Sequence, residues 1–109
     1  MLFGTQRIND KGHLEVGGVD TVELARDFGT PLYVIDEEAF RARCREYREA
    51  YSKASPGAIV SFASKAFLGR AAARLVADGG LPLDVASLGE QRIARSAWVD
   101  PKLLTLHGN

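Results

Sequence analysis

The stretch that decides the fold runs from residue 58 to residue 85 and reads AIVSFASKAFLGRAAARLVADGGLPLDV. It begins with an apolar run at 58–63, which is typical of a buried strand. A helical stripe follows, formed by Leu68, Ala71, Ala72 and Leu75. Asp78-Gly79-Gly80 ends that helix, and a second strand is expected at 81–86. The stretch therefore predicts a strand, a helix and a strand in succession.

The same alternation extends in both directions along the chain. Apolar runs at 32–35 and 103–106 predict two more strands, the first of them fully buried. The four expected strands start near residues 32, 58, 82 and 103, so their spacings are 26, 24 and 21 residues. One helix between consecutive buried parallel strands produces this repeat. The fold class is therefore α/β.

Helix signals lie between these runs. Asp20 or Thr21 begins a short helix that Gly29-Thr30-Pro31 stops, and Asp36 can cap a second helix. Cys44 lies on the apolar face of that second helix, which favours core packing over a reactive thiol. A further helix is expected from Ser87 to about Ala97. Residues 1–19 hold four glycines and predict an irregular or extended arm whose own fold stays open.

Two architectures use a repeated strand and helix: the open doubly wound sheet and the closed barrel of eight units. No expected strand is followed by a glycine-rich phosphate loop, which favours the barrel. A complete barrel takes about 250 residues. The 109 residues therefore predict a partial (β/α)8 TIM barrel, with about its first four strands and an N-terminal arm before them.

The composition excludes several classes of protein. The 14 basic and 14 acidic side chains balance, so no broad attraction to nucleic acid or to an anionic membrane is expected. A single cysteine allows no intrachain disulfide and no cysteine-based metal cluster, and no metal site is expected. No signal peptide and no membrane-spanning stretch is evident. We expect a soluble, cytoplasmic protein.

In parallel sheets and barrels the reactive groups follow the carboxyl ends of the strands. This filter leaves Ser64-Lys65-Ala66, then Asp84 followed by Ser87 and Glu90, and then His107-Gly108-Asn109, of which Lys65 is the most informative. A partly desolvated Lys65 would offer the neutral amine that attacks an aldehyde, although an exposed loop lysine fits the same position. Asp84 is a carboxylate in an apolar strand and needs a partner if buried. His107 fits proton transfer, stacking or a purely structural hydrogen bond.

Glu90 has a competing structural explanation. Ser87-Leu88-Gly89-Glu90 matches the S-x-x-E capping box, and this pattern favours a capping role over a chemical one. Gly108 and Asn109 fit a tight polar turn equally well.

Four ordered segments resemble the fold-type III pyridoxal-phosphate-dependent decarboxylases, and among them the diaminopimelate decarboxylase family. Phe62-Ala63-Ser64-Lys65-Ala66 resembles the Y-A-x-K-A segment, with phenylalanine in place of tyrosine. Residues 83–90, LDVASLGE, resemble D-V-x-S-x-G-E, and residues 106–109, LHGN, resemble F-H-G-N. Residues 30–36, TPLYVID, resemble the start of that family's barrel, which is of the alanine racemase-like type.

The resemblance implies pyridoxal 5'-phosphate as cofactor, held covalently by Lys65, with Asp84 beside it, Ala63 approaching the ring and His107 nearby. It implies decarboxylation of meso-diaminopimelate to L-lysine and CO2, the last step of lysine biosynthesis, by a homodimer. Residues 30–109 would form the first part of the cofactor-binding barrel. Residues 1–29 would pack on a C-terminal β domain.

Alternatives stay open at the level of the sequence. A related decarboxylase of ornithine, arginine or carboxynorspermidine fits the same fold, because the residues that read the substrate lie beyond Asn109 in the family. The 109-residue chain alone is expected to be inactive, and an inert fragment used for assembly is the alternative outside enzymes.

Overall fold

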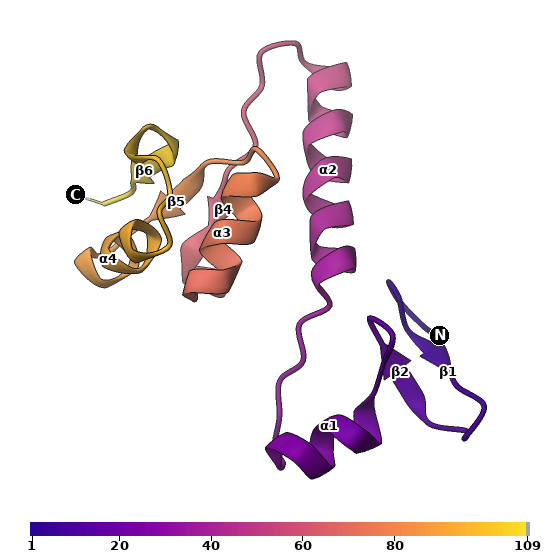
Figure 1. The fold of residues 1–109 in the computed structure, drawn as a ribbon. Coiled ribbons are helices and arrows are strands. Elements are labelled where there is room, and N and C mark those ends of the chain that lie inside the picture. Colours follow the sequence, from indigo (N-terminus) through magenta and orange to yellow (C-terminus); the bar gives the residue numbers. More distant parts are fainter. Residues whose placement is uncertain (109) are drawn as a thin grey trace. The chain divides into compact units, whose positions relative to one another are not determined.

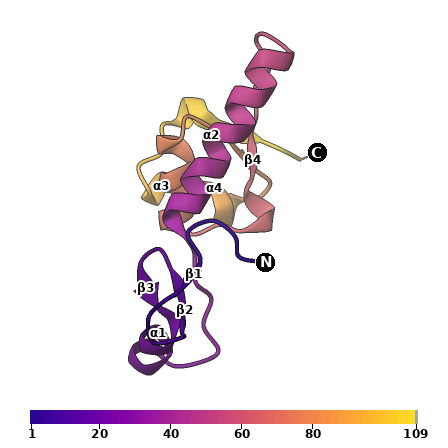
Figure 2. The same cartoon turned by 90° about the vertical axis from the view of Figure 1, so that its right-hand side faces the viewer.

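The computed structural model describes residues 1–108, which form an α/β protein whose contacts separate into two compact units. The first unit is Met1–Ala42 and the second begins at Arg43. Figures 1 and 2 show the elements of each unit.

The first unit contains a small antiparallel sheet of β1 (Arg7–Ile8), β2 (Leu14–Val16) and β3 (Val19–Asp20), in that order. Gly17 and Gly18 connect β2 to β3, and both have positive φ angles, 60° and 80°. Two such residues form the tight turn that suits a hairpin, and glycine adopts this conformation without steric cost. The segment that the sequence left open is therefore a folded hairpin with a third strand.

Two helices begin at the residues that the sequence predicted. α1 (Thr21–Phe28) is capped by Asp20, whose Oδ1 accepts the Val22 amide proton at 2.8 Å. α2 (Glu37–Ala54) follows Asp36, whose Oδ1 accepts the Ala39 amide proton at 2.9 Å. Cys44 is buried, so its predicted place in the core is confirmed.

The second unit holds a parallel sheet in the order β4 (Phe62–Ala63), β5 (Leu83–Val85) and β6 (Leu104–Leu106). The connections are formed by η1, α3, α4 and η2, which span Ser64–Ala66, Arg70–Asp78, Leu88–Ser96 and Pro101–Leu103. Helix α3 packs against both α4 and β5. The predicted succession of strands and helices is thus present from β4 to β6.

The core of this unit lies between the sheet and the two helices. Leu83 and Val85 of β5 are fully buried, as are Val76 of α3 and Ala94 of α4. Because successive side chains of a strand point to opposite faces, Asp84 faces away from this core. The pattern of β5 therefore directs one carboxylate to the other side of the sheet.

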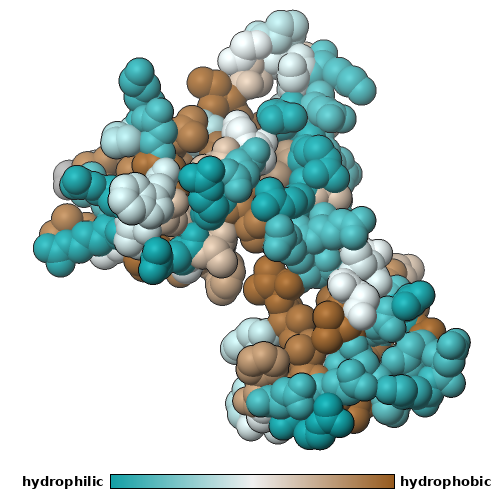
Figure 3. Space-filling view, viewed as in Figure 1, coloured by the Kyte–Doolittle hydropathy of each residue, from teal (hydrophilic) through white to brown (hydrophobic). Residues whose placement is uncertain are grey.

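The predicted strand at 32–35 is wrong. These residues form no strand, and their side chains are exposed, with Tyr33 96% accessible. A strand needs a neighbour for its backbone hydrogen bonds, and no segment of residues 1–108 pairs with this one. The strand expected at 58–63 is likewise reduced to Phe62–Ala63. The parallel sheet thus has three strands where four were expected. Apolar side chains also lie at the surface of the molecule, as Figure 3 shows.

Candidate active site

The carboxyl ends of the three parallel strands bring the predicted residues together. β4 leads directly into the turn that carries Lys65, Asp84 lies in the middle of β5, and His107 follows β6. The register pairs Ala63 with Asp84 and Asp84 with Thr105. Residues far apart in the sequence therefore meet at one edge of the sheet.

A small cavity of about 100 Å³ lies at this edge. Its lining consists of Ala63, Lys65, Asp84, Ala86 and His107. The four residues proposed from the sequence thus share one pocket, and Ala86 is the member that sequence reasoning missed. The alternation of β5 contained the signal, because Ala86 points to the same face as Asp84.

Asp84 and His107 form the closest polar contact in the pocket. Nδ1 of His107 lies 3.3 Å from Oδ2 of Asp84. The backbone amide of His107 donates to the carbonyl of Val85 at 2.8 Å, which extends the pairing of β5 and β6 by one residue. The imidazole itself is 76% exposed, and within residues 1–108 only the backbone and the carboxylate hold it.

The second oxygen of Asp84, Oδ1, is buried and has no hydrogen-bond partner among the described residues. A buried acceptor without a partner loses its hydration and gains nothing in return. A cationic or N–H donor in the pocket would satisfy it. The site therefore offers an amine, an unsatisfied carboxylate oxygen and an imidazole around one cavity.

Ser64, which precedes Lys65, has a buried hydroxyl with no partner in the described part of the chain. It belongs to η1 with Lys65, yet it does not line the pocket. Sequence reasoning did not single out Ser64, because a serine in a turn ordinarily faces water.

Ser87 and Glu90 are confirmed as capping residues. Oγ of Ser87 accepts the Glu90 amide proton at 3.2 Å, and Oε2 of Glu90 accepts the Ala86 amide proton at 2.6 Å. In a standard capping box, Glu90 would accept from the amide of the cap residue Ser87. Here it accepts from the amide of Ala86, one residue earlier. Asn109 lies outside the described residues.

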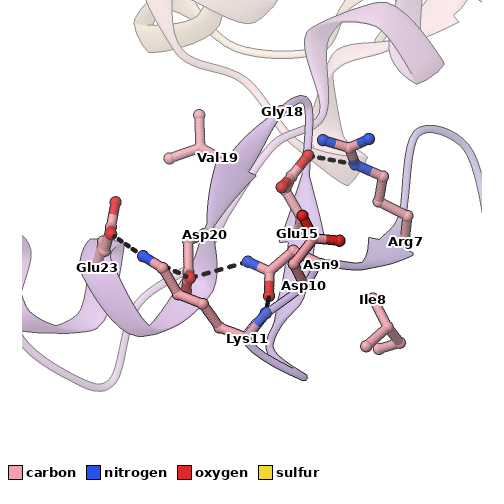
Figure 4. Close-up of a pocket in the computed structure, with 10 residues that line it drawn as sticks. All are labelled: Arg7, Ile8, Asn9, Asp10, Lys11, Glu15, Gly18, Val19, Asp20 and Glu23. Atoms are coloured by element: carbon pink, nitrogen blue, oxygen red, sulfur yellow. Dashed lines mark hydrogen bonds and ion pairs between the residues drawn. The ribbon is translucent and has the colours of Figure 1, made fainter.

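A larger hollow of about 400 Å³ lies in the first unit, and Figure 4 shows the residues that line it. Five of its six charged side chains form ion pairs with one another. Glu15 accepts from Arg7 at 2.5 Å, and Lys11 lies 2.9 Å from Glu23. These pairs account structurally for most of the charges, so we place the candidate site at the strand ends of the second unit.

The groups at the strand ends fit a cofactor with an aldehyde. Lys65 supplies the amine that would bond to the aldehyde carbon, and Oδ1 of Asp84 is an acceptor still without a donor. Among residues 1–108, no three histidine, cysteine, aspartate or glutamate side chains gather closely enough to hold a metal ion.

No family model matches the chain. Curated relatives do match: it is 47% identical over 106 residues to the diaminopimelate decarboxylase of Halalkalibacterium halodurans, covering 97% of this chain and 24% of that protein. The chain is homologous to diaminopimelate decarboxylases. It is 44% identical over 108 residues to the decarboxylase of Bacillus subtilis, covering 99% of this chain and 25% of that protein. It thus spans about a quarter of the length of these relatives.

The fold agrees with this relationship. The crystal structure of diaminopimelate decarboxylase from M. jannaschii has a TM-score of 0.84 and 38% identity, over 95% of this chain and 25% of that one. A structure of the M. jannaschii decarboxylase in complex with L-lysine has the same TM-score and identity. Within residues 1–108, no helix has both the length and the apolar character that crossing a membrane requires.

Proposed function

We propose that this chain forms the N-terminal part of a pyridoxal-phosphate-dependent diaminopimelate decarboxylase, which converts meso-diaminopimelate to L-lysine and CO2. The observation that carries the proposal is the single pocket that joins Lys65, Asp84, Ala63 and His107 at the ends of three parallel strands. The kinship with diaminopimelate decarboxylases supports the substrate, as does the L-lysine bound to the M. jannaschii relative.

Lys65 would hold pyridoxal 5'-phosphate through its Nζ atom. When bound, this cofactor supplies an electron sink for the pair left by departing carbon dioxide. Asp84 would face the amine with its unpartnered Oδ1 and stabilise a positive charge there. Ala63 has only a methyl group, which leaves the space beside the strand open to a flat ring.

The architecture belongs to the same proposal. Residues 30–109 would form the first strands of an alanine racemase-like TIM barrel, and residues 1–29 would pack on a C-terminal β domain. Three parallel strands with helices between them support the first part. A cytoplasmic homodimer that binds a small amino-acid substrate completes the proposal.

A chimera tests the function, with residues 1–109 in place of the matched quarter of the Bacillus subtilis decarboxylase. We expect borohydride reduction in the presence of pyridoxal phosphate to add the cofactor mass to Lys65, located by peptide mass spectrometry. We also expect CO2 release from meso-diaminopimelate, with Lys65→Arg inactive and Lys102→Arg unaffected. Label on Lys53 or Lys102, or turnover of ornithine in place of diaminopimelate, would contradict the proposal.

A further inference from the structure

The two oxygens of the Asp84 carboxylate have different surroundings. Oδ2 lies 3.3 Å from Nδ1 of His107, whereas Oδ1 is buried without a partner among the described residues. An ionised carboxylate can only accept hydrogen bonds, so an imidazole that donates to it through Nδ1 would have to carry its proton there. The other ring nitrogen, Nε2, is then a free acceptor.

His107 is held from two sides and is otherwise free. Its amide donates to Val85 at 2.8 Å, which places Cα at the end of β6, and the carboxylate of Asp84 lies against Nδ1. The rest of the ring is exposed and lines the pocket that Lys65 also lines. Nε2 is therefore accessible to a group in that pocket.

The first unit contains a histidine and an aspartate that do form this hydrogen bond. Nδ1 of His13 lies 2.9 Å from Oδ2 of Asp20, within hydrogen-bonding distance. The 3.3 Å separation at His107 is looser, as is common for functional pairs before a ligand closes the site. The two histidines are the only ones in the chain, so each serves as a reference for the other.

We propose that Asp84 is a positioning residue that holds His107 with its proton on Nδ1, and that Nε2 of His107 is the proton acceptor for the amine of Lys65. In this step the N–H bond of the Lys65 ammonium breaks, its electron pair stays on Nζ, and the proton forms a new N–H bond at Nε2. Asp84 stabilises the resulting imidazolium. The inference rests on the proposed function, since a neutral Lys65 is what an aldehyde cofactor requires.

The ionisable groups of the pocket are Lys65, Asp84 and His107. Glu90 is the next carboxylate along the chain, and its Oε2 is engaged by the Ala86 amide. Asp84 is therefore the acceptor to remove, and Glu90 offers a matched control. Glu90→Gln keeps an oxygen for that amide and removes only the charge.

The tautomer can be read by nitrogen-15 NMR of the histidine-labelled chain without cofactor, above pH about 8, where an ordinary histidine is neutral. We expect His107 and His13 both with the proton on Nδ1, assigned with His13→Gln. Asp84→Ala should move the His107 proton to Nε2 and leave His13 unchanged, whereas Glu90→Gln should change neither. Slow exchange of the His107 amide verifies that the sheet persists in Asp84→Ala.

A wild-type His107 with its proton on Nε2 overturns the inference, and so does an Nδ1 proton that persists in a folded Asp84→Ala variant. If that variant loses the sheet, the wild-type tautomer decides alone. In the chimera, His107→Gln should slow the attachment of pyridoxal phosphate to Lys65 about 100-fold at equal final yield. An unchanged rate overturns the proton step, whereas no attachment even in the unmutated chimera contradicts the proposed function and leaves the tautomer result standing.

Discussion

Asp20 shows how one buried carboxylate can organise a small unit. Burial alone raises the pKa of this carboxyl. Hydrogen bonds from His13, Asn9 and the amide of Val22 together lower it by more, so the net pKa lies below the ordinary range. A carboxyl with a lowered pKa in the folded state stabilises that state above its unfolded pKa, about 3.9. The stabilisation is lost as the pH falls through the lowered folded pKa.

We expect Asp20→Asn to flatten the acid dependence of stability. The variant has no titrating group at this position, so its free energy of unfolding should fall less steeply below pH about 4 than that of the wild type. Urea unfolding followed by circular dichroism over a pH series measures this. Asp10→Asn, at an exposed position nearby, serves as the control. Parallel acid profiles for Asp20→Asn and the wild type would show that the network contributes nothing to folding.

Trp98 is strained at its backbone. It has a φ of 58° and follows Ala97, the C-cap residue of α4; its side chain is 84% exposed, so little apolar contact offsets the strain. Glycine adopts positive φ without steric cost, whereas alanine keeps the Cβ atom that causes it. We expect Trp98→Gly to be about 1 kcal/mol more stable than Trp98→Ala by thermal unfolding. Equal stability of the two variants would mean that the chain relaxes at this position.

At the scale of elements, α4 begins with a cap that its sequence encodes locally. Oγ of Ser87 accepts the Glu90 amide proton at 3.2 Å. We expect Ser87→Ala to lower the free energy of unfolding by about 1 kcal/mol, because an amide of the first turn loses its partner. Ser96→Ala, at the other end of α4, is the control. A cost no larger than that of Ser96→Ala would indicate that water replaces the cap.

At the scale of the whole molecule, apolar segments with unpaired backbone groups should determine whether the chain self-associates in solution. The segment 32–35 is exposed and belongs to no strand, and β4 and β6 each pair on one side only within residues 1–108. Such segments recruit strands from other chains. We expect the chain to self-associate at concentrations of roughly tens of micromolar, which analytical ultracentrifugation measures. Val34→Lys should reduce it more than Ser52→Lys, which adds the same charge on α2. A monodisperse monomer would contradict this.

The sequence alone predicted those features of this protein that depend on residues close together in the chain. Asp20, Asp36 and Ser87 mark helix starts because a capping side chain bonds to amides only two or three residues away. Lys65 could be identified because it is the charged residue between two apolar segments, a strand that ends just before it and a helix start just after it.

The tertiary structure decided whatever depends on a partner distant in the sequence. The apolar run 32–35 has strand composition, but pairing requires a neighbour, and the described residues provide none. The contact between Asp84 and His107 follows from the register of β5 on β6. Burial of the Ser64 hydroxyl depends on what packs over it. Helix caps close within one turn, whereas sheet pairing and burial join residues tens of positions apart, so only the folded chain determines them.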